Sequence, residues 1–151
     1  MNIGILGAGN IAGSMARTIC GMAAQGRPVT LCAVASRSQE KADAFAKAYG
    51  IPRAYGSYAA MLNDPLVELV YIATPHSHHA EQIRQCVAAG KPVLCEKSFT
   101  ANAKQAEDVL REAEAAGVYV AEAIWTRYMP ARGMIADIIA SGEIGELRFL
   151  S

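Results

Sequence analysis

Short apolar runs alternate along this chain with longer segments in which apolar residues recur every three or four positions. Apolar runs of this length predict β-strands, and they occupy Asn2–Leu6, Val29–Ala35, Arg53–Tyr55, Val67–Ala73, Pro92–Cys95 and Val118–Glu122. The run from Val67 to Ala73 is almost continuously apolar, which is typical of a strand buried on both faces of a parallel sheet.

Segments of helical period follow these runs. In the first segment Ile11, Met15, Ile19 and Met22 form an apolar stripe, which predicts the buried side of a helix. Three further helices are expected to carry apolar positions within residues 42–49, 80–87 and 103–113 and to end at Gly50, Gly90 and Gly117, and two more are expected at residues 58–63 and 131–140. This alternation of strand and helix predicts an α/β fold, a doubly wound parallel sheet with right-handed crossovers and helices on both faces.

The end of the chain predicts a domain boundary. Residues 1–145 are expected to form one domain, whereas Glu146–Ser151 has the pattern of a new strand. We expect residues 146–151 to begin a second, substrate-binding domain that is largely absent from this sequence. The alternative is that this strand lies at the edge of the same sheet.

Composition narrows the class of function. The chain is 52% hydrophobic and 19% charged with a formal net charge of zero, so it lacks the basic surface that nucleic-acid binding requires. No apolar run reaches the roughly 20 residues that span a membrane. A signal peptide is not expected, because no basic region or cleavage site precedes the first predicted strand. Four separated cysteines, Cys20, Cys32, Cys86 and Cys95, are expected to be buried free thiols. We therefore expect a cytoplasmic protein.

A glycine-rich turn follows the first predicted strand. Gly7-Ala8-Gly9-Asn10-Ile11-Ala12 matches the pattern GxGxxA at a strand-to-helix junction, which is the fingerprint of a Rossmann dinucleotide-binding fold. Gly7 permits the tight turn, Gly9 lets a pyrophosphate approach, and Ala12 allows close packing of the helix. Asn10 and Ile11 open the helix, whose free N–H groups bind an anion. The alternatives are a turn without a ligand and a turn that binds a different nucleotide.

The residues after the second predicted strand bear on the choice of dinucleotide. NAD enzymes usually place Asp or Glu here to bind the ribose 2′-hydroxyl, but this chain has Ser36 and Arg37. Arg37 is suited to a 2′-phosphate, with help from Ser36 and Lys41. We expect NADP in preference to NAD, which remains possible. In the alternative, Arg37 is a solvated loop residue.

Two further strands end in polar loops. Thr74, Pro75, His76 and His79 follow the strand that ends at Ala73, and they are expected to line the cofactor crevice. The alternative is a polar helix start. A metal site is not expected, because no further ligand accompanies the histidines. Glu96 and Lys97 follow the next strand, where a lysine can bind a substrate oxygen and take part in proton transfer.

Together these residues resemble the glucose–fructose oxidoreductase, inositol dehydrogenase and MocA family, written Gfo/Idh/MocA. The resemblance rests on the glycine turn, on Ala33–Arg37, on Ala73-Thr74-Pro75 with His79, and on Glu96-Lys97. It implies that Lys97 is the catalytic residue that contacts substrate and nicotinamide. The sequence departs from the family at Ser98, where proline is usual, and at His76, where many members have asparagine.

The segment from Glu122 to Arg127 is similar to the branch of the family that contains dihydrodiol dehydrogenase and NADP-dependent xylose dehydrogenase. This similarity implies NADP and a vicinal diol or aldopyranose substrate, and it implies that Trp125 and Arg127 border the nicotinamide and substrate. The alternative for Trp125 is packing at a sheet edge. Relatives commonly assemble as homo-oligomers, so the same is expected of the full-length protein.

The sequence therefore predicts the cofactor-binding domain of an NADP-dependent oxidoreductase. Hydride would pass between nicotinamide and a hydroxyl-bearing carbon of a sugar, polyol or diol, and the isolated chain is expected to be inactive. The first alternative is a non-catalytic NADP(H)-binding redox sensor on the same fold. A methyltransferase that uses S-adenosylmethionine is disfavoured, because Ser36-Arg37 stands where such enzymes usually carry an acidic residue.

Overall fold

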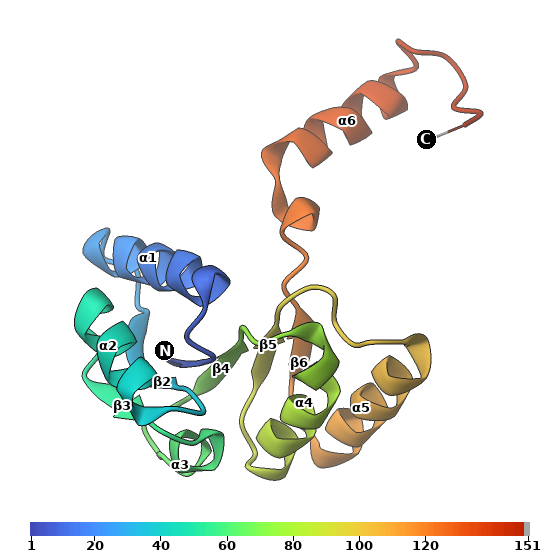
Figure 1. The fold of residues 1–151 in the computed structure, drawn as a ribbon. Coiled ribbons are helices and arrows are strands. Elements are labelled where there is room, and N and C mark those ends of the chain that lie inside the picture. The colour runs from blue at the N-terminus through green and yellow to red at the C-terminus, as the bar shows by residue number, and fades with distance from the viewer. Residues whose placement is uncertain (150–151) are drawn as a thin grey trace.

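The computed structural model describes residues 1–149 and contains a six-stranded parallel sheet in the order β3-β2-β1-β4-β5-β6 (Figure 1). The strands are β1 (Asn2–Leu6), β2 (Thr30–Ala35), β3 (Arg53–Tyr55), β4 (Leu69–Ile72), β5 (Val93–Cys95) and β6 (Val120–Glu122). Every neighbouring pair is parallel. The strand order reverses between β1 and β4, so the carboxyl ends of these two strands flank the switch point where such sheets bind ligands.

Helices cover both faces of the sheet, as predicted. The helices of the described residues are α1 (Asn10–Ala24), α2 (Gln39–Tyr49), α3 (Tyr58–Leu62), α4 (His79–Ala88), α5 (Ala103–Ala116) and α6 (Pro130–Ser141), with short 3-10 helices η1 (His76–His78) and η2 (Trp125–Tyr128), and those that cover the sheet are α1 to α5. One core cluster joins α1 and α2 to the sheet, and the other joins α3, α4 and α5 to it. Figure 1 shows α6 projecting away from the sheet. The predicted doubly wound fold is therefore confirmed.

Local sequence signals explain where two of these helices begin and end. The side chain of Ser38 accepts a hydrogen bond from the Lys41 N–H at the start of α2, and that of Asn102 accepts one from the Gln105 N–H at the start of α5. Gly50 and Gly117 end the same helices in the left-handed conformation, which glycine adopts without steric cost.

The predicted inner face of α1 is partly wrong. Ile11 and Met22 are exposed, whereas Ala12 and Ala16 are completely buried beside Ile19. The reason is the short distance at which the glycine turn holds α1 against the sheet: small side chains fit in that space, and the larger ones are displaced to the sides of the helix.

Two other expectations differ from the structure. Cys20 is exposed on α1, while Cys32, Cys86 and Cys95 are buried as expected. Helical spacing places Cys20 one position after the buried Ile19, which turns its side chain outward.

Residues 146–149 form no strand, and 150–151 lie outside the described residues. A strand needs a neighbouring strand to pair with, and β6 at the sheet edge pairs only with β5 in the described part of the chain. No helix among the described residues is long and apolar enough to cross a membrane.

Candidate dinucleotide site

The glycine turn lies where three strands end. The Gly7 N–H donates to the Ala35 carbonyl at 2.8 Å, and the Ala73 N–H donates to the Leu6 carbonyl at the same distance. Gly7 has a φ of 109°, and a Cβ built there would lie 2.8 Å from the Ala73 carbonyl oxygen. Only glycine fits this position, because any side chain would be strained and would collide with the end of β4.

The residues after Gly7 leave one end of α1 open. Gly9 is the N-cap residue and offers no side chain to the first helical N–H groups. A Cβ built on Gly9 would meet no atom within 4 Å, so the packing of the chain itself does not require glycine there. Asn10 and Ile11 are exposed and Ala12 is buried. This open, uncapped helix end fits a pyrophosphate.

The motif continues one residue further than the sequence pattern suggested. A Cβ on Gly13 would lie 2.4 Å from the Tyr49 hydroxyl oxygen, so this glycine allows α1 to approach α2. The Arg17 guanidinium donates to the same hydroxyl at 3.2 Å. The signal in the sequence is a small residue directly after GxGxxA, but its partner Tyr49 lies 36 residues away.

The loop after β2 presents cationic side chains beside the start of α2. Ser36 is buried and its N–H donates to the Tyr55 carbonyl at 3.0 Å, whereas Arg37 and Lys41 are exposed. Neither Arg37 nor Lys41 belongs to an ion pair within residues 1–149. Burial raises the pKa of Tyr58, and the positive charge of Arg37 opposes that rise. The exposed charge of Arg37, outside any ion pair of the described residues, is suited to an anionic ligand.

The loop after β4 divides into exposed and buried residues. Pro75 and His76 are exposed, while the Thr74 hydroxyl donates to the Gln82 amide oxygen. His79 is only 1% exposed. Its Nε2 lies 2.8 Å from the Thr74 carbonyl oxygen and its Nδ1 lies 3.0 Å from the Ser98 carbonyl oxygen. The His79 ring thus joins the loop after β4 to the loop after β5.

The loop after β5 carries Lys97 with its side chain exposed. The Lys97 N–H donates to Glu96 Oε2 at 3.1 Å, and the buried Tyr71 hydroxyl donates to Glu96 Oε1. The Phe99 N–H donates to Glu122 Oε1 at 2.9 Å. The peptide bond between Lys97 and Ser98 is cis.

Sequence reasoning missed Tyr71 of β4 and Glu122 of β6, whose side chains form hydrogen bonds with this loop. Burial and the Glu96 carboxylate raise the pKa of Tyr71, so its phenol is a neutral donor. The signals available in the sequence were a single hydroxyl within the apolar β4 and a carboxylate at the end of β6.

The three histidines are not arranged as a set of metal ligands in the part of the chain that the structure describes. Within residues 1–149 no group of three or more His, Cys, Asp or Glu side chains is arranged to hold a metal ion. His79 is engaged with backbone carbonyls, while His76 and His78 are exposed on η1.

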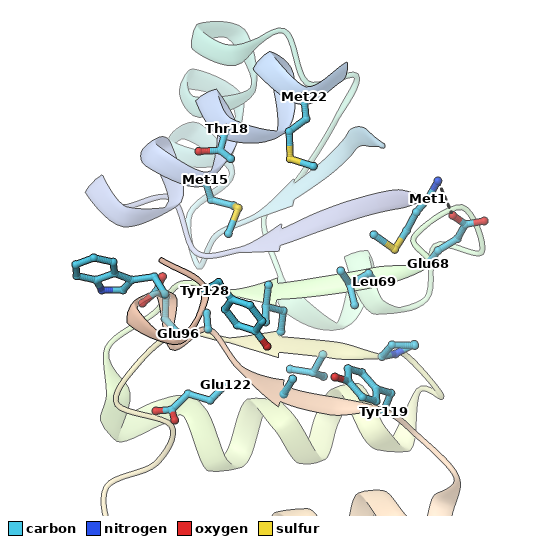
Figure 2. Close-up of a pocket in the computed structure, with 16 residues that line it drawn as sticks. Met1, Met15, Thr18, Met22, Glu68, Leu69, Glu96, Tyr119, Glu122 and Tyr128 are labelled. Atoms are coloured by element: carbon cyan, nitrogen blue, oxygen red, sulfur yellow. Dashed lines mark ion pairs between the residues drawn. The ribbon is translucent and has the colours of Figure 1, made fainter. Parts of the chain in front are cut away.

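An apolar groove of about 990 Å³ lies between α1 and strands β4, β5 and β6. Figure 2 shows Met15 and Met22 of α1 on one side of it and Tyr119 and Tyr128 on the other. Of the predicted site residues, Glu96 and Trp125 line this groove. The glycine turn and Arg37 lie outside it, so the groove adjoins the Lys97 end of the candidate site.

The glycine turn, the open end of α1 and the polar loops at the switch point together define a dinucleotide-binding domain of the Rossmann type. A comparison with protein families gives the same result. The model described as "Oxidoreductase family, NAD-binding Rossmann fold" matches residues 1–123, and the chain belongs to this family, Gfo/Idh/MocA.

Individual relatives confirm the predicted branch. The chain is 40% identical over 145 residues to trans-1,2-dihydrobenzene-1,2-diol dehydrogenase of Mus musculus, covering 96% of this chain and 43% of that protein. It is 39% identical over 150 residues to D-xylose 1-dehydrogenase (NADP(+)) of Hypocrea jecorina, covering 94% of this chain and 38% of that protein. The chain thus spans less than half the length of these two relatives.

A solved structure shares the fold. KijD10, a 3-ketoreductase from Actinomadura kijaniata solved in complex with NADP, superposes with a TM-score of 0.88 at 30% sequence identity. The match covers 98% of this chain and 46% of that one.

Proposed function

We propose that this chain is the cofactor-binding domain of an NADP-dependent dehydrogenase that acts on a hydroxyl-bearing carbon of a sugar, polyol or diol. One observation carries the proposal: the open glycine turn after β1 and the Lys97 loop after β5 follow strands on either side of the same switch point. A dinucleotide laid across the carboxyl ends of the strands reaches both.

The pyrophosphate binds at the start of α1. Gly9 leaves space for it, and the uncapped N–H groups at Asn10 and Ile11 donate to its oxygens. The positive end of the helix dipole adds to the attraction. Gly7 and Ala12 act indirectly, because they set the path of the turn and the approach of the helix.

The adenosine 2′-phosphate binds beside the start of α2. Arg37 offers a planar pair of charged donors, Lys41 a second positive charge and Ser36 a hydroxyl. The xylose dehydrogenase and the ketoreductase described above carry NADP in their names or complexes, which supports the same cofactor here.

The nicotinamide half lies toward Lys97. The bound cofactor supplies the hydride acceptor. The Lys97 ammonium hydrogen-bonds the substrate hydroxyl, polarises it and aligns it for transfer. Thr74, Pro75 and His76 line the crevice beside the nicotinamide ribose. The Glu96 carboxylate accepts a hydrogen bond from the Lys97 N–H. Trp125, 62% exposed on η2, provides an aromatic face for the substrate ring.

The rest of the protein is part of the proposal. We infer a second domain that starts within residues 146–151, follows the Rossmann domain of residues 1–145 and supplies the second acid–base group. The full-length protein is proposed to be a homo-oligomer. A cytoplasmic location stays a prediction.

Calorimetric titration with NADP⁺ and NAD⁺ tests the cofactor assignment. The unmodified chain should bind NADP⁺ more tightly. Arg37→Ala should lower the affinity for NADP⁺ by roughly tenfold or more, since a charged hydrogen bond contributes about 1.5–3 kcal/mol, and it should leave NAD⁺ binding unchanged. Arg111→Ala, at an exposed position on α5, is the matched control. An unchanged affinity ratio in Arg37→Ala contradicts the 2′-phosphate site.

Lys97→Ala separates the dehydrogenase from a non-catalytic redox sensor. If the full-length protein is a dehydrogenase, Lys97→Ala should lower its turnover at least about a hundredfold, while its affinity for NADP⁺ stays near the original value. A sensor should keep its full response to NADP(H), and that result would reject the catalytic role of Lys97.

A further inference from the structure

Three consecutive residues of the Lys97 loop each have a main-chain atom bonded to a side chain. The Lys97 N–H donates to Glu96 at 3.1 Å, the Ser98 carbonyl faces His79 Nδ1 at 3.0 Å, and the Phe99 N–H donates to Glu122 at 2.9 Å. Exposed loops usually leave such groups to water. This one, with Lys97 and Ser98 exposed, is held by side chains from several elements.

We infer that Tyr71, His79 and Glu122 are positioning residues that fix the backbone of Lys97, and so the direction of its ammonium group. The inference rests on the catalytic role proposed for Lys97. Each of the three is proposed to act through its contact with the loop, which for Tyr71 is the hydrogen bond to Glu96.

Tyr71 acts from the face of the sheet that α1 covers. Its ring is 1% exposed and packs in the same cluster as Ala12 and Ala16 of α1. Its hydroxyl reaches the Glu96 carboxylate, whose second oxygen accepts the Lys97 N–H. A buried ring therefore fixes the carboxylate, and the carboxylate fixes the lysine backbone. Charged acceptors make such hydrogen bonds strong.

Glu122 and His79 act from the opposite face. Glu122 pairs in register with Cys95, and Cys95 belongs to the cluster packed against α4 and α5. His79 is the first residue of α4, and its Nε2 lies 2.8 Å from the Thr74 carbonyl oxygen. The loop is thus held from both faces of the sheet. Its position is also linked to the loop after β4, which is proposed to contact the nicotinamide ribose.

Tyr71→Phe removes one hydroxyl and keeps the buried ring. Tyr119→Phe, with the same change at a residue that is 71% exposed at the far end of the groove, is the matched control. Nuclear magnetic resonance of the chain should show a shifted and faster-exchanging Lys97 amide in Tyr71→Phe, with the Phe99 amide unchanged. In the full-length protein, Tyr71→Phe should lower turnover about tenfold and leave KM for NADP⁺ unchanged. Tyr119→Phe should change neither turnover nor the Lys97 amide.

Glu122 offers a test at the other end of the loop. Glu122→Ala removes the acceptor and should expose the Phe99 amide to faster exchange, while Glu122→Gln keeps an oxygen at the same place and should restore most of the protection and turnover. In Glu122→Ala the Lys97 ammonium group should lose its aligned hydrogen bond to the substrate hydroxyl. The pH dependence of turnover should change as a result.

The outcomes separate this inference from the proposed function. If the amides respond as expected but turnover and its pH profile do not, the side chains serve only the fold and the positioning role is wrong. If Tyr71→Phe leaves the Lys97 amide unchanged, the link through Glu96 is wrong. Failure of the unmodified chain to bind NADP⁺ would instead reject the cofactor assignment, and the amide measurements would still report on the loop.

Discussion

At the scale of single residues, three glycines in the first turn and helix have three different physical roles. Gly7 has a backbone conformation that other residues avoid, Gly13 makes room for the Tyr49 hydroxyl, and Gly9 has neither constraint. A glycine that the protein does not need for its own packing is available for the close approach of a ligand.

Gly9→Ala is therefore expected to separate binding from stability. The new methyl group enters open space at an extended backbone position, so the free energy of unfolding should change by less than about 1 kcal/mol. The same methyl group occupies the space proposed for the pyrophosphate, so NADP⁺ affinity should fall at least about tenfold. Thermal unfolding and calorimetric titration measure the two effects. Gly7→Ala is the contrasting variant and should lose stability as well.

The four thiols are expected to differ in reactivity. Burial raises the pKa of Cys86 to about 12 and also raises the pKa values of Cys32 and Cys95, whereas Cys20 is exposed. Because the thiolate is the reactive form, a disulfide reagent at mildly alkaline pH should titrate a single thiol in the folded chain and all of them after unfolding. Cys20→Ser should abolish the reaction of the folded chain, and rapid labelling of any buried thiol would contradict this assignment.

The residues that sequence reasoning identified are those with local signals. Gly7 and Gly9 stand at fixed distances from the end of β1, and that spacing predicts their role, whereas the role predicted for Lys97 came from the family resemblance. Tyr71 and Glu122 were missed because their partners Glu96 and Phe99 lie 25 and 23 residues away. Only the parallel register of the folded sheet places these residues together.

At the scale of elements, Asp64 connects the segment after α3 to β3. Its side chain is 7% exposed and pairs with Arg53 at 2.9 Å. It also accepts from the Leu66 N–H and the Tyr55 hydroxyl, each at 2.9 Å. The Leu66 N–H, the Tyr55 hydroxyl and the positive charge of Arg53 hold the pKa of Asp64 below its usual range.

Asp64→Asn is expected to lower the free energy of unfolding and to make that free energy less dependent on pH. A depressed pKa in the folded state adds stability above the unfolded pKa of about 4, and that contribution is lost as the pH falls through the folded value. In urea unfolding, the free energy of unfolding of Asp64→Asn should be about 2 kcal/mol lower at neutral pH. It should also fall less steeply below about pH 5 than that of the unmodified chain. Asp137→Asn, at an exposed position on α6, is the control, and an equal effect there would contradict the assignment.

The strands and helices themselves were predictable to within a few residues, because short apolar runs and helical periods are strong local signals. The buried side of α1 was not. The four-residue spacing of Ile11, Met15 and Ile19 predicted a large apolar face, but close approach to the sheet selects Ala12, Gly13 and Ala16 instead. That choice depends on the distance between layers, which no single segment encodes.

At the scale of the whole molecule, bound NADP⁺ is expected to stabilise the fold. A ligand at one hundred times its dissociation constant adds about 2.7 kcal/mol to the free energy of unfolding. For a domain of this size the melting temperature should rise by about 5 to 10 °C. Differential scanning calorimetry with NADP⁺, and with Arg37→Ala as the control, measures this rise. A melting temperature that does not change at saturating NADP⁺ would show that the folded chain does not bind it.

The order of strands has a consequence for how this protein can change. The loop that carries Arg37 leaves β2, and the loop that carries Lys97 leaves β5, with β1 and β4 between them. Three strand spacings of about 4.8 Å separate the two strand ends by about 14 Å. Substitutions that far apart usually contribute additively to free energies. The residues proposed to set cofactor preference and those proposed for the reaction are therefore expected to vary independently, so that either loop can be redesigned while the other stays as it is.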